Sequence, residues 1–527
     1  MTDAPGPKAA DADRIAQGYQ MDGAALEFGT VVLDGTAYPQ ARIRVPLSMV
    51  NRHGLIAGAT GTGKTKTLQG LAEQLSAAGV PVVVADIKGD LSGLAQPGTQ
   101  NDKIAQRCAD TGDTDWQPTA FPVEFLALGG VGTGIPLRAT MTSFGPTLLA
   151  KVLGLNDTQE SSLNLIFHFA DSAGLSLLDV KDLRAVISYL TSDEGKGDLK
   201  ELGGLSASTA GVILRNLIGL QDQGADAFFG EPEFETADLL RTTVDGRGVI
   251  SSVELANLQQ RPQLFSTFLM WLLADLFHDL PEVGDVDKPK LVFFFDEAHL
   301  LFDGASKAFL EAVTQTVRLI RSKGVGVFFV TQNPQDVPDA VLGQLGNRVQ
   351  HALRAFTPDD ASALAKAVRT YPKTTDYDLA DALQHLGTGE AIVTVLSESG
   401  APTPVAWTRM RPPRSLMAQI EATTQQQAVA GSPLQAKYGT AIDGESAYEK
   451  LNTKLAAAPT PSAAPTPPAA QTPTDGKPAA RPPKPAKPQP SAVEQVLKSS
   501  AFKSFARSTA TVLGREITRS IFGTRRR

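Results

Sequence analysis

Residues 58–65 form a glycine-rich loop whose residue types suit the binding of a polyphosphate. They read Gly58-Ala59-Thr60-Gly61-Thr62-Gly63-Lys64-Thr65, a complete G-x-x-x-x-G-K-[ST] motif. The glycines let the backbone turn tightly and present successive N–H groups to an anion. In such a loop Lys64 reaches the β- and γ-phosphates, and the Thr65 hydroxyl ligates Mg²⁺. We therefore predict that residues 58–66, ending at Lys66, bind ATP and Mg²⁺.

The residues on either side of this loop are those of a strand and a helix. Leu55-Ile56-Ala57 has the composition of the end of a buried strand, and Leu68, Leu71 and Leu75 recur at helical spacing after the loop. A strand, a glycine-rich loop and a helix in this order are the context that the motif requires. A plain glycine-rich turn would need neither the lysine nor the threonine, so the flanks favour nucleotide binding.

A pair of carboxylates follows an apolar strand far along the chain. A predicted strand over residues 290–295, apolar after Lys290, leads directly into Asp296-Glu297-Ala298-His299. Two adjacent carboxylates at the end of a buried strand are costly without a cation to neutralise them. We predict that Asp296 holds Mg²⁺ through water and that Glu297 polarises the attacking water. His299 has no second histidine or cysteine at metal-ligand spacing, so we expect it to be a packing or hydrogen-bonding residue.

Two further apolar strands end in polar residues. Residues 80–86 lead into Asp86-Ile87-Lys88-Gly89-Asp90, and residues 326–330 lead into Thr331-Gln332. Ligands of open α/β sheets bind beyond the carboxyl ends of the strands. Asp86 and Lys88 are therefore either a second layer of the site or simple caps of their strand. We predict that Gln332 senses the γ-phosphate.

Four arginines are candidates for a residue that completes the site of a neighbouring subunit. Arg318 and Arg321 lie on the polar side of a predicted helix over residues 306–321, and Arg348 and Arg354 lie on a predicted strand over residues 348–356. An arginine acting in trans raises the rate of other NTPases by about 10³ to 10⁵. We assign this role to Arg348 and keep Arg318, Arg321 and Arg354 as alternatives, because the sequence does not distinguish them.

The pattern of strands and helices predicts an α/β protein made of several segments. Continuous apolar strands are typical of a buried, mostly parallel sheet, whereas residues 137–245 carry apolar residues three and four apart, as helices do. The expected segments are a flexible lead (1–22), a small N-terminal β-element that packs beside the core (23–50), the first part of a P-loop NTPase core (51–136), an all-helical insertion (137–245), the second part of the core (246–412), a helical extension (413–458), a Pro/Ala-rich disordered linker (459–490) and a basic amphipathic helix (491–527).

Charge divides the chain into an acidic body and a basic tail. The formal net charge is −7, but residues 457–527 carry 12 Lys/Arg against 3 Asp/Glu, so that the tail has a net charge of +9 and the rest −16. Residues 459–490 hold 12 of the 35 prolines and cannot form a packed core. The basic helix after them suits a protein partner, nucleic acid, an anionic membrane or the acidic body of its own assembly, and the sequence leaves these open.

The cysteine content and the apolar runs bear on the cellular compartment. A single cysteine, Cys108, excludes an intramolecular disulfide framework and suits a reducing cytosol. No run approaches the roughly 18 apolar residues that a membrane span needs, and the N-terminus has no apolar signal region. We expect a cytoplasmic protein without a transmembrane segment.

Taken together, these motifs resemble the HerA-like family of P-loop ATPases, in the FtsK/HerA group of DNA-pumping motors. The similarity is greatest to the bacterial branch named for the C-terminal region of the HerA helicase. The resemblance implies a RecA-like ASCE fold, hydrolysis of Mg²⁺-ATP by a ring that is usually hexameric, and movement of DNA through the pore. The residues that carry it are 58–65, 86–91, 143–155 with Gln159, 178–183, 293–300, 321–324, 331–334 and 346–350.

The resemblance gives Lys64, Thr65, Asp296, Glu297 and Gln332 their usual roles, and it sets the functional expectation. The acidic body lacks the dense basic stripe that is typical of a DNA groove, although a pore can be lined by a few Lys or Arg per subunit. We expect a homo-hexameric ATPase that acts as a DNA translocase or helicase-like motor. The alternatives are a ring ATPase that acts on a protein partner and a nucleotide-dependent scaffold with little turnover.

Overall fold

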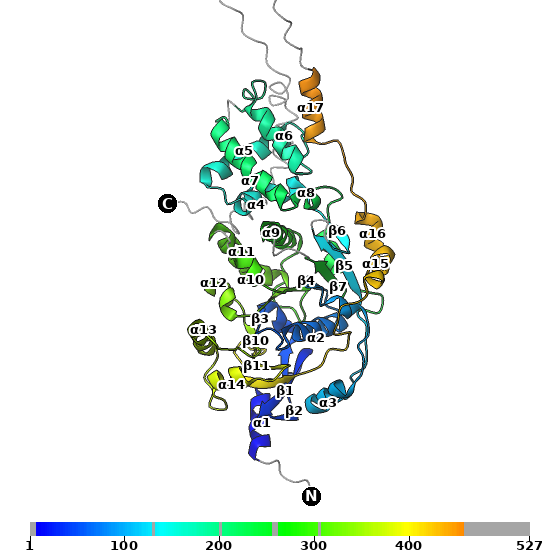
Figure 1. Cartoon of the computed structure of the whole chain (residues 1–527), viewed down its shortest axis with the longest axis vertical. Coiled ribbons are helices and arrows are strands. Elements are labelled where there is room, and N and C mark those ends of the chain that lie inside the picture. The colour runs from blue at the N-terminus through cyan, green and yellow to red at the C-terminus, as the bar shows by residue number, and fades with distance from the viewer. Residues whose placement is uncertain (1–6, 129–131, 200–202, 256–261, 304–306, 458–527) are drawn as a thin grey trace, which may run out of the picture.

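The computed structural model describes residues 7–128, 132–199, 203–255, 262–303 and 307–457 (Figure 1). The linker predicted over residues 459–490 and the basic helix predicted over residues 491–527 lie outside the described residues. The described part is elongated. A large sheet with helices on both faces fills its middle and lower parts in Figure 1, and a group of helices lies at the upper end.

Twelve strands form one sheet in the order β2-β1-β12-β11-β10-β3-β9-β8-β4-β7-β5-β6. From β10 to β6 every neighbouring pair is parallel, whereas the pairs from β2 to β10 are antiparallel. The strands are β1 (Ala25–Leu33), β2 (Thr36–Pro46), β3 (Gly54–Ala57), β4 (Val82–Asp86), β5 (Val123–Leu128), β6 (Ile135–Leu137), β7 (Ile250–Glu254), β8 (Leu291–Phe295), β9 (Val325–Thr331), β10 (Asn347–Gln350), β11 (Glu390–Thr394) and β12 (Ala406–Met410).

The order of the parallel strands places the predicted motifs at one edge of the sheet. Strand β3, which leads into the glycine-rich loop, lies next to β9, and β9 lies next to β8, which leads into Asp296. One strand therefore separates the loop from the two carboxylates, as in the ASCE group of P-loop proteins. The predicted α/β fold with a RecA-like P-loop core is confirmed.

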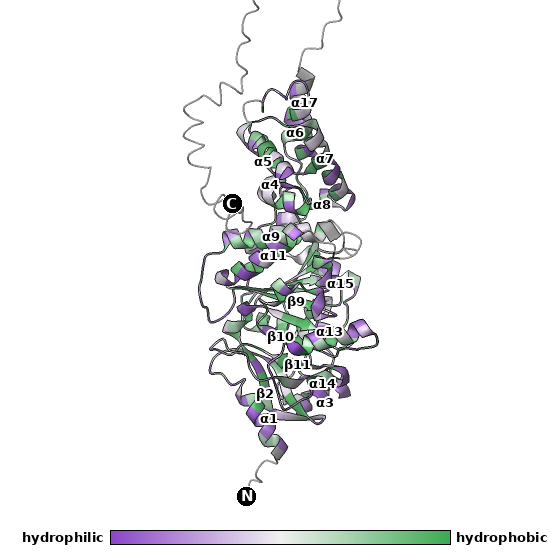
Figure 2. Cartoon of the chain, turned by 90° about the vertical axis from the view of Figure 1, so that its left-hand side faces the viewer, coloured by the Kyte–Doolittle hydropathy of each residue, from purple (hydrophilic) through white to green (hydrophobic). Residues whose placement is uncertain are grey.

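Both faces of the parallel strands are buried, which explains their continuous apolar runs. Along β4, Val82 and Val84 pack toward α2 (Lys64–Ala77), whereas Val83 and Ala85 belong to the apolar cluster on the opposite face, with α9 (Pro262–Asp279) and α11 (Lys307–Ile320). Figure 2 shows the apolar strands enclosed by helices with more hydrophilic outer sides. The remaining helices near the sheet are α3 (Asp102–Thr111), α10 (His299–Phe302) and α12 (Asp339–Leu342).

The N-terminal residues differ from the flexible lead that was expected for residues 1–22. Residues 7–17 form helix α1 (Pro7–Gln17), which packs on β1 and β2. Its anchor is a buried stripe of Ala12, Ile15 and Ala16 that continues to Tyr19, and the spacing of these residues is that of one helix face. The Tyr19 hydroxyl donates to the Val393 carbonyl of β11, so this helix is tied to the sheet.

The small β-element expected to pack beside the core is instead part of the main sheet. Strands β1 and β2 form a hairpin around the Asp34-Gly35 turn, and β1 pairs with the last strand, β12. Because β12 comes from the far end of the folded chain, this pairing could not be read from the local alternation of polar and apolar residues.

Helices between β6 and β7 form the upper group in Figure 1. They share an apolar cluster with one face of the sheet, and the Phe228 ring lies 5.8 Å from Trp271 of α9, edge to face. The group is therefore packed onto the core through α9. Its members are α4 (Met141–Val152), α5 (Asp157–Ser172), α6 (Val180–Thr191), α7 (Ala207–Asp222) and α8 (Ala225–Phe228).

The segment after β12 returns along the molecule as a strap, which we define as residues 412–446. Its start is not helical and crosses the outer side of α2, where the Ser415 N–H donates to the buried Glu73 carboxylate at 3.0 Å. It then forms α15 (Ala422–Gly431) and α16 (Pro433–Tyr438), and α17 (Ala447–Ala457) follows it and packs on α6 (Figure 1).

A third apolar cluster holds the residues that follow β10. Leu353 packs with Leu364 of α13 (Pro358–Arg369) and Leu383 of α14 (Leu379–His385). The strand predicted over residues 348–356 is therefore shorter in the structure, because β10 ends at Gln350 and the chain leaves the sheet to meet these two helices.

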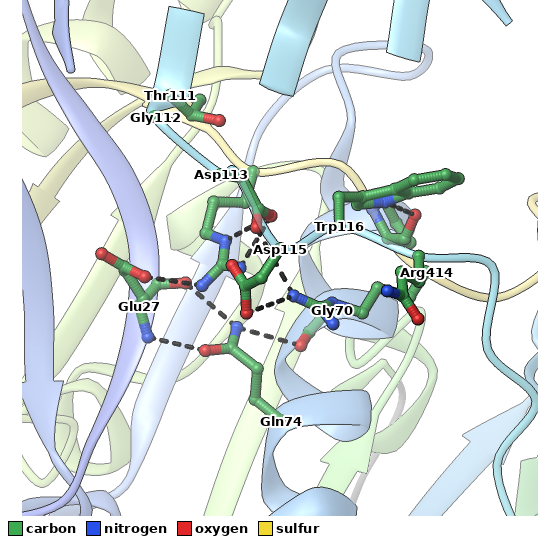
Figure 3. A network of polar contacts seen from close by, with 12 residues as sticks. Glu27, Gly70, Gln74, Thr111, Gly112, Asp113, Asp115, Trp116 and Arg414 are labelled. Carbon is green, nitrogen blue, oxygen red and sulfur yellow. Dashed lines mark hydrogen bonds and ion pairs between the residues drawn. The ribbon is translucent and has the colours of Figure 1, made fainter. Parts of the chain in front are cut away.

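A network of ion pairs fastens the strap to the loop after α3 (Figure 3). Asp113, whose side chain is 1% exposed, accepts from Arg411 at 2.7 Å and lies 3.4 Å from Arg414. Arg411 also pairs with Glu27 of β1, and the Trp116 ring N–H donates to the Pro413 carbonyl. These contacts join the first strand, the α3 loop and the start of the strap.

We expect Asp113→Ala to lower the free energy of unfolding by about 3 kcal/mol, because it leaves two partly buried arginines without their shared carboxylate. Asp115→Ala is the matched control, since Asp115 also pairs with Arg414 but is 81% exposed, and its loss should cost less than about 1 kcal/mol. Urea unfolding followed by circular dichroism measures both. Equal losses for the two variants would show that the network does not depend on its buried carboxylate.

Candidate nucleotide site

The glycine-rich loop follows β3 directly and ends in the first turn of α2. Gly61 has φ +78° and Gly63 has φ +116°, values that residues with side chains rarely adopt. At Gly58 a Cβ atom would lie 2.5 Å from the Cβ of His351. The three glycines of the motif are therefore required by the backbone path itself, which leads directly into the N-terminus of α2, where an anion is favoured.

Lys64 lies over the loop with its ammonium group bonded to the loop's own carbonyls. Its Nζ donates to the Gly58 carbonyl at 2.6 Å and to the Ala59 carbonyl at 3.1 Å. Burial lowers the pKa of this ammonium group, although the nearby Glu297 and Asp296 carboxylates oppose the shift. Thr65 follows, half-buried, in the first turn of the helix. Both side chains thus lie at the end of α2 where an anion is favoured.

Asp296 and Glu297 are both buried at the end of β8. The Glu297 N–H donates to the Asp296 carboxylate at 2.9 Å. Burial, reinforced by the Glu297 charge, raises the pKa of Asp296 to about 6. Glu297 has φ +48°, an uncommon conformation for a residue with a side chain, and it turns the chain sharply after the strand.

The Glu297 carboxylate is paired with Lys88, which follows β4. The Lys88 ammonium group donates to Oε1, while Oε2 lies 3.3 Å from Nδ1 of His299. Burial alone would raise the pKa of Glu297, but the hydrogen bond and charge of Lys88 outweigh it, and the pKa is lowered. His299 is half-buried and faces this carboxylate, so it lies beside the site in addition to its expected packing role.

The two candidates after β4 have different positions. The buried Asp86 carboxylate accepts from the backbone N–H groups of Lys88, Gly89 and Leu91, so it caps the turn that follows the strand. Lys88 is the residue that this turn directs to Glu297. Asp86 therefore fits the capping alternative and Lys88 the second-layer alternative.

Gln332 is exposed immediately beyond β9. It lines a cleft of about 720 Å³ together with Ala59 of the glycine-rich loop, His299 and Arg354. The Gln332 side chain contributes to the lowered pKa of Glu297. The preceding residue, Thr331, is fixed by a 2.6 Å hydrogen bond from its hydroxyl to Asp336. A side chain at this position lies between the loop and the Glu297 carboxylate.

The four candidate arginines lie in three different places. Arg354 is exposed in the cleft beside Gln332 and also lines a second cleft, of about 390 Å³, with Gly61 and Thr62. Arg318 and Arg321 are exposed near the start of β9, at the opposite edge of the sheet from the loop. Arg348 lies on β10, where its guanidinium donates to the carbonyls of Leu345 and Leu342 in the same protomer.

The sequence motifs did not reveal that residues 387–390 support the glycine-rich loop. The Gly389 N–H donates to the Thr62 carbonyl at 2.9 Å, and a Cβ on Gly63 would lie 3.2 Å from the Gly389 backbone. Arg107 of α3 in turn donates to the Gly389 carbonyl at 3.0 Å. The two glycines at 387 and 389 just before a strand were the available signal, but nothing local connects them to a loop more than three hundred residues earlier.

The residues at the site fit Mg²⁺ bound together with a nucleotide. Within the described residues no three His, Cys, Asp or Glu side chains gather as a ready-made metal site. A magnesium ion usually takes one or two protein ligands and keeps the rest for water and phosphate. Thr65 and Asp296 match this small donor set, and the buried Oε2 atom of Glu297, 3.3 Å from Nδ1 of His299, has no hydrogen-bond partner among the described residues.

Comparison with protein families identifies the chain. The model of the family described as "Helicase HerA-like C-terminal" matches residues 32–527. The chain belongs to this family. The predicted resemblance is thereby confirmed, and family membership makes the protein a HerA-like P-loop ATPase. No curated protein matches the sequence, and none of the helices in the described part is both long and apolar enough to cross a membrane.

Solved structures with a similar fold have low sequence identity to this HerA-like chain. The bacterial conjugative coupling protein TrwB, in its unbound form, is 14% identical and covers 77% of this chain and 94% of its own, with a TM-score of 0.48. TrwB in complex with ADP and Mg²⁺ is 14% identical, covers 76% and 94%, and has a TM-score of 0.49. VirB4 of Thermoanaerobacter pseudethanolicus is 15% identical, covers 74% and 97%, and has a TM-score of 0.46.

The raised pKa of Asp296 predicts how Mg²⁺-dependent nucleotide binding varies with pH. Protons compete with Mg²⁺ for a carboxylate, so below about pH 6 the affinity for Mg²⁺-ADP should fall by up to about tenfold per pH unit. Calorimetric titrations at pH 7.5, 6.5 and 5.5, with and without Mg²⁺, measure this. Asp296→Asn should weaken Mg²⁺-ADP binding and reduce its pH dependence to the part that comes from the ADP phosphates, whose last proton is lost at about pH 6. An affinity of the unmodified protein that stays constant down to pH 5.5 would show that Asp296 is not in contact with the metal shell.

Proposed function

We propose that this protein is an oligomeric, Mg²⁺-dependent ATPase that moves along or translocates DNA. The observation that carries the proposal is the convergence of Lys64, Glu297 and Gln332 on one end of the sheet, next to the loop that presents its N–H groups. Membership of the HerA-like family supports the motor class. The DNA substrate and the hexameric ring rest on the resemblance and remain part of the proposal.

Each residue of the site has a distinct role in this proposal. The N–H groups of Gly58, Ala59 and Thr62 already donate to carbonyls. The other N–H groups of residues 58–66 and the Lys64 ammonium group bind the phosphates, and Lys64 exchanges its loop carbonyls for phosphate oxygens when ATP enters. Thr65, and Asp296 through water, would hold Mg²⁺, which would supply positive charge to offset that of the phosphates. Glu297 orients and polarises the attacking water. Lys88 keeps the Glu297 carboxylate ionised before that attack. Gln332 contacts the γ-phosphate and transmits its loss to the residues after β9.

The arginine that completes the site comes from a neighbouring subunit. Arg318 and Arg321 are exposed and lie at the far edge of their own sheet, away from the loop, which supports a role in trans. Arg348 is bonded to carbonyls of its own protomer, which favours a supporting role. Arg354 lies beside its own loop and is placed to act in cis. We therefore move the trans assignment from Arg348 to Arg318 or Arg321.

The first experiment distinguishes a DNA motor from a protein-directed ring. We expect ATP hydrolysis to be stimulated by double-stranded or single-stranded DNA at 50 mM salt, and the stimulation to fall steeply by 200 mM, because phosphate contacts release counterions. Lys64→Ala should abolish hydrolysis in every condition. Lys64-dependent hydrolysis that is indifferent to DNA would instead favour a ring that acts on a protein partner.

Glu297→Gln tests whether the nucleotide is turned over or serves as a switch. The amide is nearly isosteric but does not polarise water, so we expect hydrolysis to fall by about 10² to 10⁴ while ATP binding is retained. A matched control is Glu311→Gln, an exposed carboxylate on α11. Hydrolysis that persists in Glu297→Gln would contradict the assigned role, and an assembly that needs ATP but not hydrolysis would favour the scaffold alternative.

A further inference from the structure

His351 is a fully buried histidine directly beneath the glycine-rich loop. It follows β10, and its N–H donates to the Ala57 carbonyl at the end of β3, at 2.7 Å. Its Cβ occupies the space that a side chain at Gly58 would need, and its Cε1 lies 3.6 Å from where a Cβ of Gly63 would be. The residue thus touches the loop at both of its ends.

Both ring nitrogens of His351 have a partner, and the two partners lie on different elements. Nδ1 lies 2.8 Å from the Glu390 carbonyl at the start of β11, and Nε2 lies 2.9 Å from the hydroxyl of Thr67 in the first turn of α2. Burial, together with the nearby Lys64 charge, lowers the pKa of His351 to about 4, although the hydrogen bond to the Glu390 carbonyl opposes the shift. The ring is therefore neutral near pH 7.

These contacts fix the tautomer. A carbonyl oxygen only accepts hydrogen bonds, so Nδ1 carries the proton and donates it to Glu390. Nε2 is then the acceptor, and the Thr67 hydroxyl donates to it. A neutral ring in this tautomer satisfies both neighbours without placing a second positive charge under the phosphate site, where Lys64 already supplies one.

We propose that His351 is a positioning residue that sets the conformation of the glycine-rich loop by joining Thr67 of α2 to Glu390 of β11. This inference rests on the proposed nucleotide site and names a residue that determines its shape. A second contact supports the loop from the same part of the chain. The N–H of Gly389, the residue before Glu390, donates to the Thr62 carbonyl. The sheet therefore contacts the loop region at two points, through Thr67 of α2 and through Thr62 within the loop. Nucleotide affinity depends on these two contacts.

Thr67→Val is the mildest test, because it removes one hydroxyl and keeps the shape of the side chain. We expect it to raise the Kd for ATP about tenfold, the effect of losing one buried hydrogen bond, with kcat at saturating ATP changed less than about twofold. The control is Thr316→Val, another buried threonine, whose hydroxyl bonds only within α11, to the Ala312 carbonyl among the described contacts.

Two replacements of His351 separate its two contacts. In His351→Gln the side-chain amide reaches about the position of Nε2, so this variant should retain the contact with Thr67. In His351→Asn the amide reaches about the position of Nδ1, so this variant should retain the contact with the Glu390 carbonyl. Thr67→Val combined with His351→Asn should weaken binding no more than the weaker-binding single variant, because both remove the same hydrogen bond. Additive losses in the double variant would show that the two residues do not act through each other.

Hydrogen–deuterium exchange in the nucleotide-free protein provides a readout that needs no activity. Thr67→Val and His351→Asn should speed exchange in peptides covering residues 58–67, while Thr316→Val should not. Unchanged exchange together with unchanged Kd in Thr67→Val would overturn the proposal. If the unmodified protein bound no nucleotide but exchange responded as expected, the nucleotide function would fail and the positioning role of His351 would stand.

Discussion

The burial of two adjacent carboxylates is the constraint on which the site depends. Asp296 and Glu297 lie at the end of a strand covered on both faces, where an unpaired charge is costly. The Lys88 ammonium group offsets one of these charges directly, and Lys64 acts on both from across the loop. The two lysines come close to the carboxylates only if β3 and β4, which lead to Lys64 and Lys88, lie near β8. The strand order β3-β9-β8-β4 places them there.

The strap, near the end of the folded chain, also contacts the elements that position the two lysines. Gln419 donates to the Lys88 carbonyl at 2.7 Å, and Ser415 is bonded to both Gln69 and Glu73 of α2. The turn that directs Lys88 and the helix that follows the glycine-rich loop are therefore held by the same segment. Since that segment continues to α17 on the helical group, the surroundings of the glycine-rich loop and the far end of the molecule are joined by the same stretch of chain.

Sequence reasoning recovered what is encoded locally. The glycine motif, the apolar strands and the polar residues at their ends identify themselves by composition, and they were sufficient to predict the fold class and the family. Helix α1 could also have been predicted, because Ala12, Ile15, Ala16 and Tyr19 have the spacing of one helix face. The charged residues around them are typical of a flexible segment, which is what was predicted there. The partner of β1 was not readable, since β12 is nearly four hundred residues away and antiparallel pairing leaves no mark on either strand alone.

The same distinction explains why the sequence is enough to propose phosphate ligands but not the residues that contact the loop from beneath. Lys64 and Thr65 are defined by their distance along the chain from a glycine, so one sequence is enough to find them. His351, Gly389 and Arg107 act by lying beneath or beside the loop, and their residue types fit many other roles. A buried histidine with both nitrogens bonded is a common packing arrangement. It becomes informative only when the structure shows that its two partners are the helix and the strand between which a phosphate loop is held.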